Sequence, residues 1–442
     1  MQAATSNQPT SEGLLRAIRR WDLVALAVNG IIGAGIFGLP SEAFSRIGVY
    51  SLAAFIVCGA AVALIVLCFA EVASRFTQTG GPYLYAREAF GPAVGFQVGW
   101  MMWVARTTAF AVNCNVLLAY LTFFVPAAGG GLVRAGIITL IVVSLTAVNV
   151  VGVRDAAVVT NVFTVAKLVP LAIFVVAGMF FLDPAAFTPG PLPGYGDFSV
   201  AVLLLIYAFS AFEQATVAGG EARDPRRDVP YAMLLALAVV VVIYVGIQIV
   251  AVGTLPTLAS ATRPLADAAG RFLGAAGAAL MTVGAIVSIF GNLNGILLVA
   301  SRITFAMAQR GELPPWIGAT HARFHTPLAA ILSTAALALV LTISGTFVYI
   351  LTVSVIARLL VYAGTCAALP TLRRRTDVAP AAFVAPAGTL IAFIALALVA
   401  WLLTHITLPQ ARDAAITAAA GQALYWAATR RRRAPEVGSS LA

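Results

Sequence analysis

Long apolar runs alternate with short polar gaps along nearly the whole chain. A helix needs about 20 apolar residues to cross the hydrocarbon core of a bilayer. The strands of a membrane barrel instead alternate apolar and polar residues over about 10 positions, whereas these runs are longer and continuously apolar. The pattern therefore predicts an all-α membrane protein with about twelve transmembrane helices. Their centres lie near residues 31, 62, 108, 143, 170, 208, 242, 290, 335, 358, 392 and 420.

Composition agrees with a chain that lies mostly in lipid. Hydrophobic residues make up 61% of the 442 positions and charged residues 10%, whereas soluble domains carry roughly a quarter charged residues. We expect no sizeable soluble domain. The expected organisation is a polar N-terminal tail over 1–20, without the pattern of a signal peptide, a transmembrane domain over 21–430 and a tail over 431–442.

The basic residues predict the orientation. Of the 27, 19 fall in the tails or in loops on one side of the predicted spans, 5 fall on the other side, and 3 lie within spans. Cytoplasmic loops are enriched in Lys and Arg, so both termini are expected in the cytoplasm and the protein in the cytoplasmic (inner) membrane. The net charge of +10 thus follows topology and does not indicate nucleic-acid binding. The four cysteines and three histidines show no metal-like spacing, so no metal, cofactor or catalytic residue is expected.

Two of the predicted spans are interrupted. In the first, Gly33, Gly35 and Gly38 spell the dinucleotide fingerprint, but they lie inside an apolar run and not between a strand and a helix. The glycines allow either close helix packing or local unwinding, since each costs about 1 kcal/mol in a helix interior. Unwinding would free N–H groups at the start of the outer half-helix, where a carboxylate binds well.

The second interruption lies in the sixth span, over 207–216, and includes Ser210 and Glu213. Paired interrupted spans in corresponding halves are typical of transporter binding sites. The two are five spans apart, so the second copy would be inverted. This predicts inverted repeats over about 21–182 and 198–371, followed by two extra helices over about 379–430.

Four charged residues lie deep in predicted spans. Lys167 is the only lysine of the chain; a buried amine can give up its proton, which a guanidinium cannot, although a fixed ion pair or a snorkelling side chain is the alternative. Glu213 is a candidate functional residue, because a carboxylate deep in a span is costly to bury. The alternative is that it is neutral or paired with a basic residue of another span. Arg106 and Arg358 either pair with Glu213 or face a water-filled cavity. The Asn and Thr residues of spans 3 and 8 cannot be assigned to one face: Thr107, Thr108, Asn113, Asn115, Asn292 and Asn294.

Several motifs in order resemble the amino acid–polyamine–organocation permeases, from Trp21 to about Trp426. They are the first-span segment 30–37, the segments 71–76, 79–83 and 87–92, the loop 221–230, and the segments 301–308 and 311–314. The resemblance implies the inverted five-span repeat of bacterial leucine transporters, with spans 1 and 6 unwound. Arg106 and Arg358 match no motif of this family.

The resemblance also implies a substrate site. The carboxylate of an amino acid would meet the backbone of Gly33, Ala34 and Gly35, and its amine would meet carbonyls at Ile31 and in the span 6 break. Lys167 matches a lysine that takes the place of a sodium ion in proton-dependent relatives. Glu213 matches a position that is acidic in some relatives. Both residues are therefore candidates for proton coupling. The residues expected in the span 6 break are Tyr207, Ala208, Phe209 and Ser210.

We therefore expect a secondary transporter that moves amino acids by alternating access, proton-coupled or exchanging, and not an enzyme. The alternative within the same superfamily is a carrier of cationic amino acids or polyamines, which Glu213 would favour. A channel is disfavoured because channels use symmetric selectivity rings. The expected partners are the amino acid, a proton or counter-substrate and the lipid bilayer. The sequence does not predict the oligomeric state.

Overall fold

The computed structural model describes residues 18–151, 156–324, 326–344 and 346–433, with side chains except at 156–163 and 431–433. Within these ranges the chain is helical, and its only strand-like feature is an isolated pairing of Ile18 with Ala222. Most of the two predicted tails, together with Arg16 and Arg154, lies outside the described residues.

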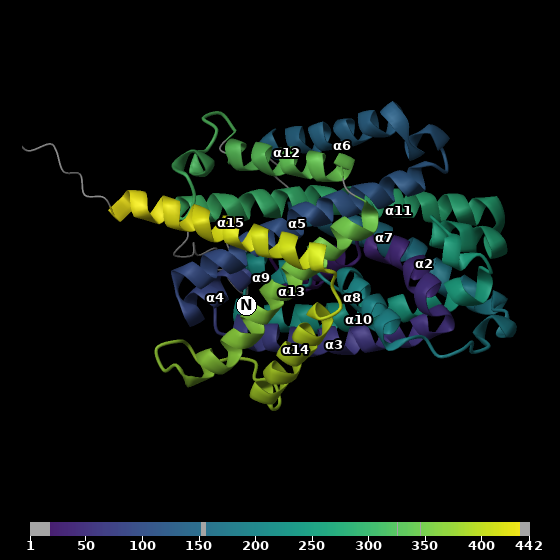
Figure 1. Cartoon of the computed structure of the whole chain (residues 1–442), viewed down its shortest axis with the longest axis horizontal. Helices are drawn as coiled ribbons and strands as arrows, with labels where there is room; N and C mark the ends of the chain where they lie inside the picture. The colour runs from purple at the N-terminus through teal and green to yellow at the C-terminus, as the bar shows by residue number, and fades with distance from the viewer. Residues whose placement is uncertain (1–17, 152–155, 325, 345, 434–442) are drawn as a thin grey trace, which may run out of the picture.

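Most of the helices run along the long axis of the molecule (Figure 1). Each of the twelve centres predicted from the sequence lies within one of them. The α-helices are α1 (Arg20–Ile31), α2 (Gly35–Ile47), α3 (Ser51–Ala73), α4 (Gly81–Phe90), α5 (Pro92–Leu121), α6 (Gly131–Val151), α7 (Ala156–Gly178), α8 (Tyr195–Ala208), α9 (Gln214–Val217), α10 (Pro225–Thr254), α11 (Pro264–Gln309), α12 (Leu328–Ser344), α13 (Phe347–Arg374), α14 (Gly388–Leu403) and α15 (Leu408–Arg433).

Seven helical segments among the described residues are long and apolar enough to cross a membrane, or eight if the pair α14 and α15, bent by 120°, forms one span. The molecule is thus an all-helical protein with several candidate membrane spans. Helices α8 and α12 are apolar but shorter, and α1 is only 12 residues long. Twelve crossings and the inverted repeat therefore stay predictions.

Both interruptions predicted from the sequence are present as helix breaks. The first separates α1 from α2 at residues 32–34, and the second separates α8 from α9 at residues 209–213. In the second break Ala211 has a φ of 78°, a left-handed conformation that costs energy for a residue with a Cβ. Such strain persists only where the surroundings impose it, as at binding sites and switches.

The glycines of the first break also allow close packing against the second. A Cβ on Gly35 would lie 2.7 Å from the Cα of Ala208, and a Cβ on Gly30 would lie 2.9 Å from the carbonyl oxygen of Ala211. Both contacts are with backbone atoms, which cannot move aside as a flexible side chain can. Both interpretations of the glycine cluster, local unwinding and close helix packing, therefore apply to this segment.

The two breaks lie at the centre of a bundle in which α5 packs against both α11 and α13, α1 against α7 and α10, and α2 against α8. Helices α6 and α12 lie side by side at one edge (Figure 1). Two features were not predicted from the sequence. Helix α4 is short and too polar for a span, and α11 is interrupted at Gly274, whose φ of 65° favours glycine.

Candidate functional site

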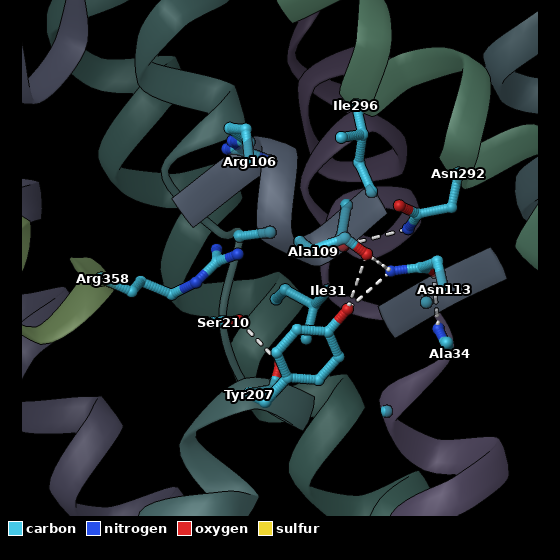
Figure 2. A pocket seen from close by; sticks show the side chains of 14 residues that line it. Ile31, Ala34, Arg106, Ala109, Asn113, Tyr207, Ser210, Asn292, Ile296 and Arg358 are labelled. Atoms are coloured by element: carbon cyan, nitrogen blue, oxygen red, sulfur yellow. Dashed lines mark hydrogen bonds between the residues drawn. The ribbon is translucent and has the colours of Figure 1, made fainter. Parts of the chain in front are cut away.

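A cavity of about 300 Å³, its open mouth included, lies between the two helix breaks. Figure 2 shows Arg106 and Arg358 at one side of the cavity and Asn113, Asn292 and Ala34 at the other. Helices α1, α2, α5, α8, α11 and α13 and the two breaks contribute the lining residues: Gly30, Ile31, Gly33, Ala34, Gly35, Arg106, Ala109, Asn113, Tyr207, Ser210, Ala211, Asn292, Ile296 and Arg358.

An amide side chain occupies part of the predicted carboxylate position. Asn113 accepts a hydrogen bond from the N–H of Ala34 (3.1 Å) and donates to the hydroxyl of Tyr207 (2.6 Å). The N–H of Gly33 bonds the carbonyl of Ile31 (2.8 Å). The N–H of Gly35 begins α2 and has no acceptor within that helix. A carboxylate bound here would therefore use the Gly35 end of the segment, or displace Asn113 from Ala34.

Side chains also satisfy the carbonyls at the end of α1. The ammonium of Lys167 donates to the carbonyls of Ile32 (2.8 Å) and Asn29 (3.2 Å). The amide of Asn292 donates to the carbonyls of Asn29 and Gly30 (both 3.4 Å). The hydroxyl of Tyr244 donates to the carbonyl of Ile31 (3.2 Å). The negative end of a helix dipole favours a cation, so Lys167 caps α1 from the next layer of helices.

A buried cluster of charges forms one wall of the cavity. Arg106 and Arg358 both donate to Oε1 of Glu213, at 3.0 and 3.1 Å, and the hydroxyl of Tyr362 donates to Oε2 at 3.1 Å. Arg106 is 1% exposed, and Arg358 and Glu213 are each 3% exposed. Of the interpretations left open for these residues, the structure has Glu213 paired with both arginines. Both arginines also reach the cavity, whereas Glu213 lies behind them.

The residues predicted to bind the substrate divide into two groups. Six of the eight line the cavity, and Ala208 and Phe209 do not. Ala208 instead packs against Gly35, and the ring of Phe209 packs against those of Phe55 and Tyr244. The two residues predicted to couple transport to protons, Lys167 and Glu213, lie directly behind the lining. Their substrate and coupling roles stay predictions.

The cavity lining also includes Asn113 and Asn292, two of the polar residues that the sequence located in spans 3 and 8 without assigning them to a face. Neighbouring amides of the same type face elsewhere, since Asn115 accepts a bond from Arg134 and Asn294 accepts one from Asn149 (2.9 Å). Helical periodicity shows that these asparagines point in different directions, but it does not show which direction is the cavity.

The chemistry of the site suits recognition more than catalysis. It offers helix-end donors and acceptors, two amides, one phenol and two guanidinium groups. Within the described part of the chain, no group of three or more His, Cys, Asp or Glu residues is placed to hold a metal ion.

Comparison with known proteins connects this geometry to one family. Residues 18–427 match the model of a family described as amino acid permease. An uncharacterized transporter of Mycobacterium tuberculosis is 32% identical over 330 residues, which cover 72% of this chain and 71% of the relative. A serine/threonine exchanger of Bacillus subtilis is 31% identical over 340 residues, covering 74% and 77%. A methylthioribose transporter of Bacillus subtilis is 28% identical over 338 residues, covering 73% of each chain.

Proposed function

Because this chain belongs to the amino acid permease family and is a multi-pass membrane protein, we propose that it moves amino acids across the cytoplasmic membrane by alternating access. The observation that carries the proposal is the cavity between two broken helices, which places helix-end donors and acceptors around one small space. Non-helical backbone at membrane depth is tolerated where it lines such a cavity. The serine/threonine exchange of one relative supports an amino acid as the solute.

The proposed binding mode follows the polarity of the two breaks. The α-carboxylate of the substrate binds the N–H groups at the start of α2, near Gly35, and displaces Asn113 from Ala34. The amine binds carbonyls at the end of α1, near Ile31, and in the span 6 break between Tyr207 and Ser210. This assignment places the negative group at the positive end of one helix dipole and the positive group at the negative end of another.

We assign the coupling role to Lys167. Its ammonium bonds two carbonyls of the α1 end and, among the described residues, forms no ion pair with an acidic side chain. A change in its protonation would therefore alter how firmly the end of α1 is held, and the cavity lies on the other side of that helix end. Glu213 is the less suitable proton carrier, because two arginines already share its carboxylate.

Contacts among helix ends and the adjoining loops support the proposed topology. Arg20 forms an ion pair with Asp228 (2.7 Å), and Arg226 donates a hydrogen bond to the carbonyl of Ser74 (2.9 Å). Arg373 forms a bidentate ion pair with Glu71 (both 2.7 Å). These contacts join the N-terminal segment to the loops after the second, sixth and tenth predicted spans. All of them would then lie on the side that the arginine distribution assigns to the cytoplasm.

A polar cluster on the same proposed side joins α4 to the loop after α11. Glu312 accepts hydrogen bonds from Arg87 and from the hydroxyl of Tyr83 (2.7 Å). Burial, followed by the bond to Glu312, raises the pKa of Tyr83 to about 12, so the hydroxyl remains a donor. We propose that these loop contacts break and re-form as the two repeats move against each other.

The alternative, a carrier of cationic amino acids or polyamines, is not favoured by the geometry. It rested on Glu213 as a counter-ion in the pocket. In the structure this carboxylate is paired with Arg106 and Arg358, and the arginines separate it from the cavity. A cationic side chain would approach two guanidinium groups first.

Two measurements test the proposed function. The first is competition of the common amino acids and of polyamines for the purified protein. The second is flux of the bound solute into proteoliposomes, with a pH gradient in one set and with solute loaded inside in another. Gradient-driven uptake indicates proton coupling, and uptake that needs internal solute indicates exchange. Binding of no amino acid, with no amino-acid flux under either condition, would refute the proposal.

A further inference from the structure

The wall formed by α5 and α13 carries more positive charge than its own carboxylate balances. Arg106 and Arg358 both line the cavity, whereas none of the described residues that line it is acidic. Their shared partner is the single carboxylate Glu213, to which each donates one hydrogen bond. Two guanidinium groups and one ionised carboxylate leave a net charge of +1 in a buried cluster.

Such a charge is costly unless something completes it. A buried charge without a partner is strongly destabilising, and more so at membrane depth. Lys167 adds a further cation on the other side of the first break. The four charged groups around the cavity therefore sum to a positive total, which an anionic solute would reduce.

The arginines also have unused donors. The Nε atoms of Arg106 and Arg358 are buried and have no hydrogen-bond partner among the described residues. A guanidinium has five N–H donors in a planar fork that matches a carboxylate. Buried donors that remain unpaired are expensive, so two such atoms beside a cavity indicate the place of an acceptor group.

The position for such an acceptor group lies across the cavity from the first helix break. Figure 2 places Arg106 and Arg358 on one side of the pocket and Ala34 with Asn113 on the other. The start of α2 already provides a position for an α-carboxylate, so the arginine side provides a second anion position across the cavity. We propose that the solute is an amino acid with an acidic side chain, aspartate or glutamate, whose side-chain carboxylate binds Arg106 and Arg358. This inference rests on the proposed transport of amino acids and specifies the substrate class.

The first test compares each acidic amino acid with its amide on the purified wild-type protein: aspartate with asparagine, and glutamate with glutamine. The pairs match in size and differ in charge. A charged hydrogen-bond partner is worth more than a neutral one, so we expect the better acidic amino acid to bind at least about tenfold more tightly than its amide. Amides that bind as well as the acids would overturn the assignment while leaving amino-acid transport intact.

The second test uses Arg358→Gln. This variant removes the excess charge but leaves the pair of Arg106 and Glu213 at 3.0 Å, so the buried carboxylate keeps a partner. We expect the preference for the acidic amino acid over its amide to fall by at least about tenfold, with binding of the amide retained. The reciprocal variant Arg106→Gln, which leaves Arg358 with Glu213, should behave alike. The matched control is Arg46→Gln, an exposed arginine at the end of α2, which should keep the wild-type preference.

The outcomes separate the two proposals. An acidic preference that is lost in both arginine variants supports the inference. A wild-type preference that both variants keep would overturn it. Equal loss of acidic and amide binding in folded variants would place the α-carboxylate at the arginines and also overturn it. Binding and flux of no amino acid at all would instead refute the proposed function itself.

Discussion

Replacement of Lys167 by Met tests how the broken helix is linked to a proton. Met keeps similar bulk but removes the charge and both hydrogen bonds, to the carbonyls of Ile32 (2.8 Å) and Asn29 (3.2 Å). The carbonyl of Asn29 keeps the amide of Asn292 at 3.4 Å, whereas that of Ile32 loses its charged donor. An unsatisfied buried acceptor costs about 1–3 kcal/mol, and a cation at a helix C-terminus contributes up to about 2 kcal/mol.

The end of α1 should therefore be less stable by roughly 2–4 kcal/mol in the variant, enough to shift a conformational equilibrium by more than tenfold. The assay is uptake of the best-bound amino acid into proteoliposomes, with the outside acidic or with equal pH on both sides. We expect wild-type uptake to rise with the gradient and Lys167→Met uptake to be low and independent of it.

Lys167→Arg separates the proton from the charge. Arginine retains the cation and its donors but does not release a proton. We expect this variant to bind the substrate and to lose the response to the gradient. If Lys167→Met responds to the gradient as steeply as the wild type does, the coupling role is wrong and the lysine only caps the helix. Wild-type uptake that ignores the gradient would refute proton coupling directly.

Two further variants test the packing that holds the site. Gly35→Ala places a Cβ 2.7 Å from the Cα of Ala208, the last residue of α8, so we expect a loss of about 1–3 kcal/mol in stability and weaker substrate binding. Gly38→Ala, whose Cβ meets nothing closer than 3.4 Å, should leave both unchanged, and equal effects would contradict the reasoning. Arg373→Gln removes the bidentate partner of the buried Glu71, which keeps an ion pair with Arg75 at 3.6 Å. We expect it to destabilise the protein by about 1–3 kcal/mol, measured by thermal unfolding in detergent. The control is Arg374→Gln at the adjacent, exposed arginine. An equal loss of stability in this variant would contradict the role assigned to the Arg373–Glu71 pair.

The sequence predicted the helices and both breaks because these depend on local properties. Apolar runs of membrane length, a cluster of glycines and the polar group at 210–214 are visible without any knowledge of packing. Helix α4 was not predicted because it is too short and too polar for the pattern of a span. The interruption at Gly274 was not predicted because a single glycine in a helical pattern is usually tolerated.

The candidate site was harder to predict because it depends on which helices meet. The sequence identified Arg106, Arg358 and Glu213 as intramembrane charges, but their grouping needs α5, α13 and the break after α8 to meet. The sequence left Glu213 open as a proton-coupling group, as a group that would favour a cationic substrate, or as a carboxylate paired with a basic residue of another span. The structure has it paired with Arg106 and Arg358 behind the cavity wall, and no local pattern around position 213 chooses between these alternatives.

The hydrogen bonds among the site residues bear on how tightly a solute is held. The N–H of Ala34 bonds Asn113, and the carbonyls of the α1 end bond Lys167, Asn292 and Tyr244. A bound amino acid thus exchanges one set of hydrogen bonds for another, and gains chiefly the difference between a neutral and a charged partner. That difference is about 1 kcal/mol per bond, roughly fivefold in affinity. The unpaired Nε donors of Arg106 and Arg358 are an exception, because a solute that reaches them displaces no protein acceptor. Discrimination between solutes should therefore come mainly from the arginine side, while the two helix breaks bind the part that all amino acids share.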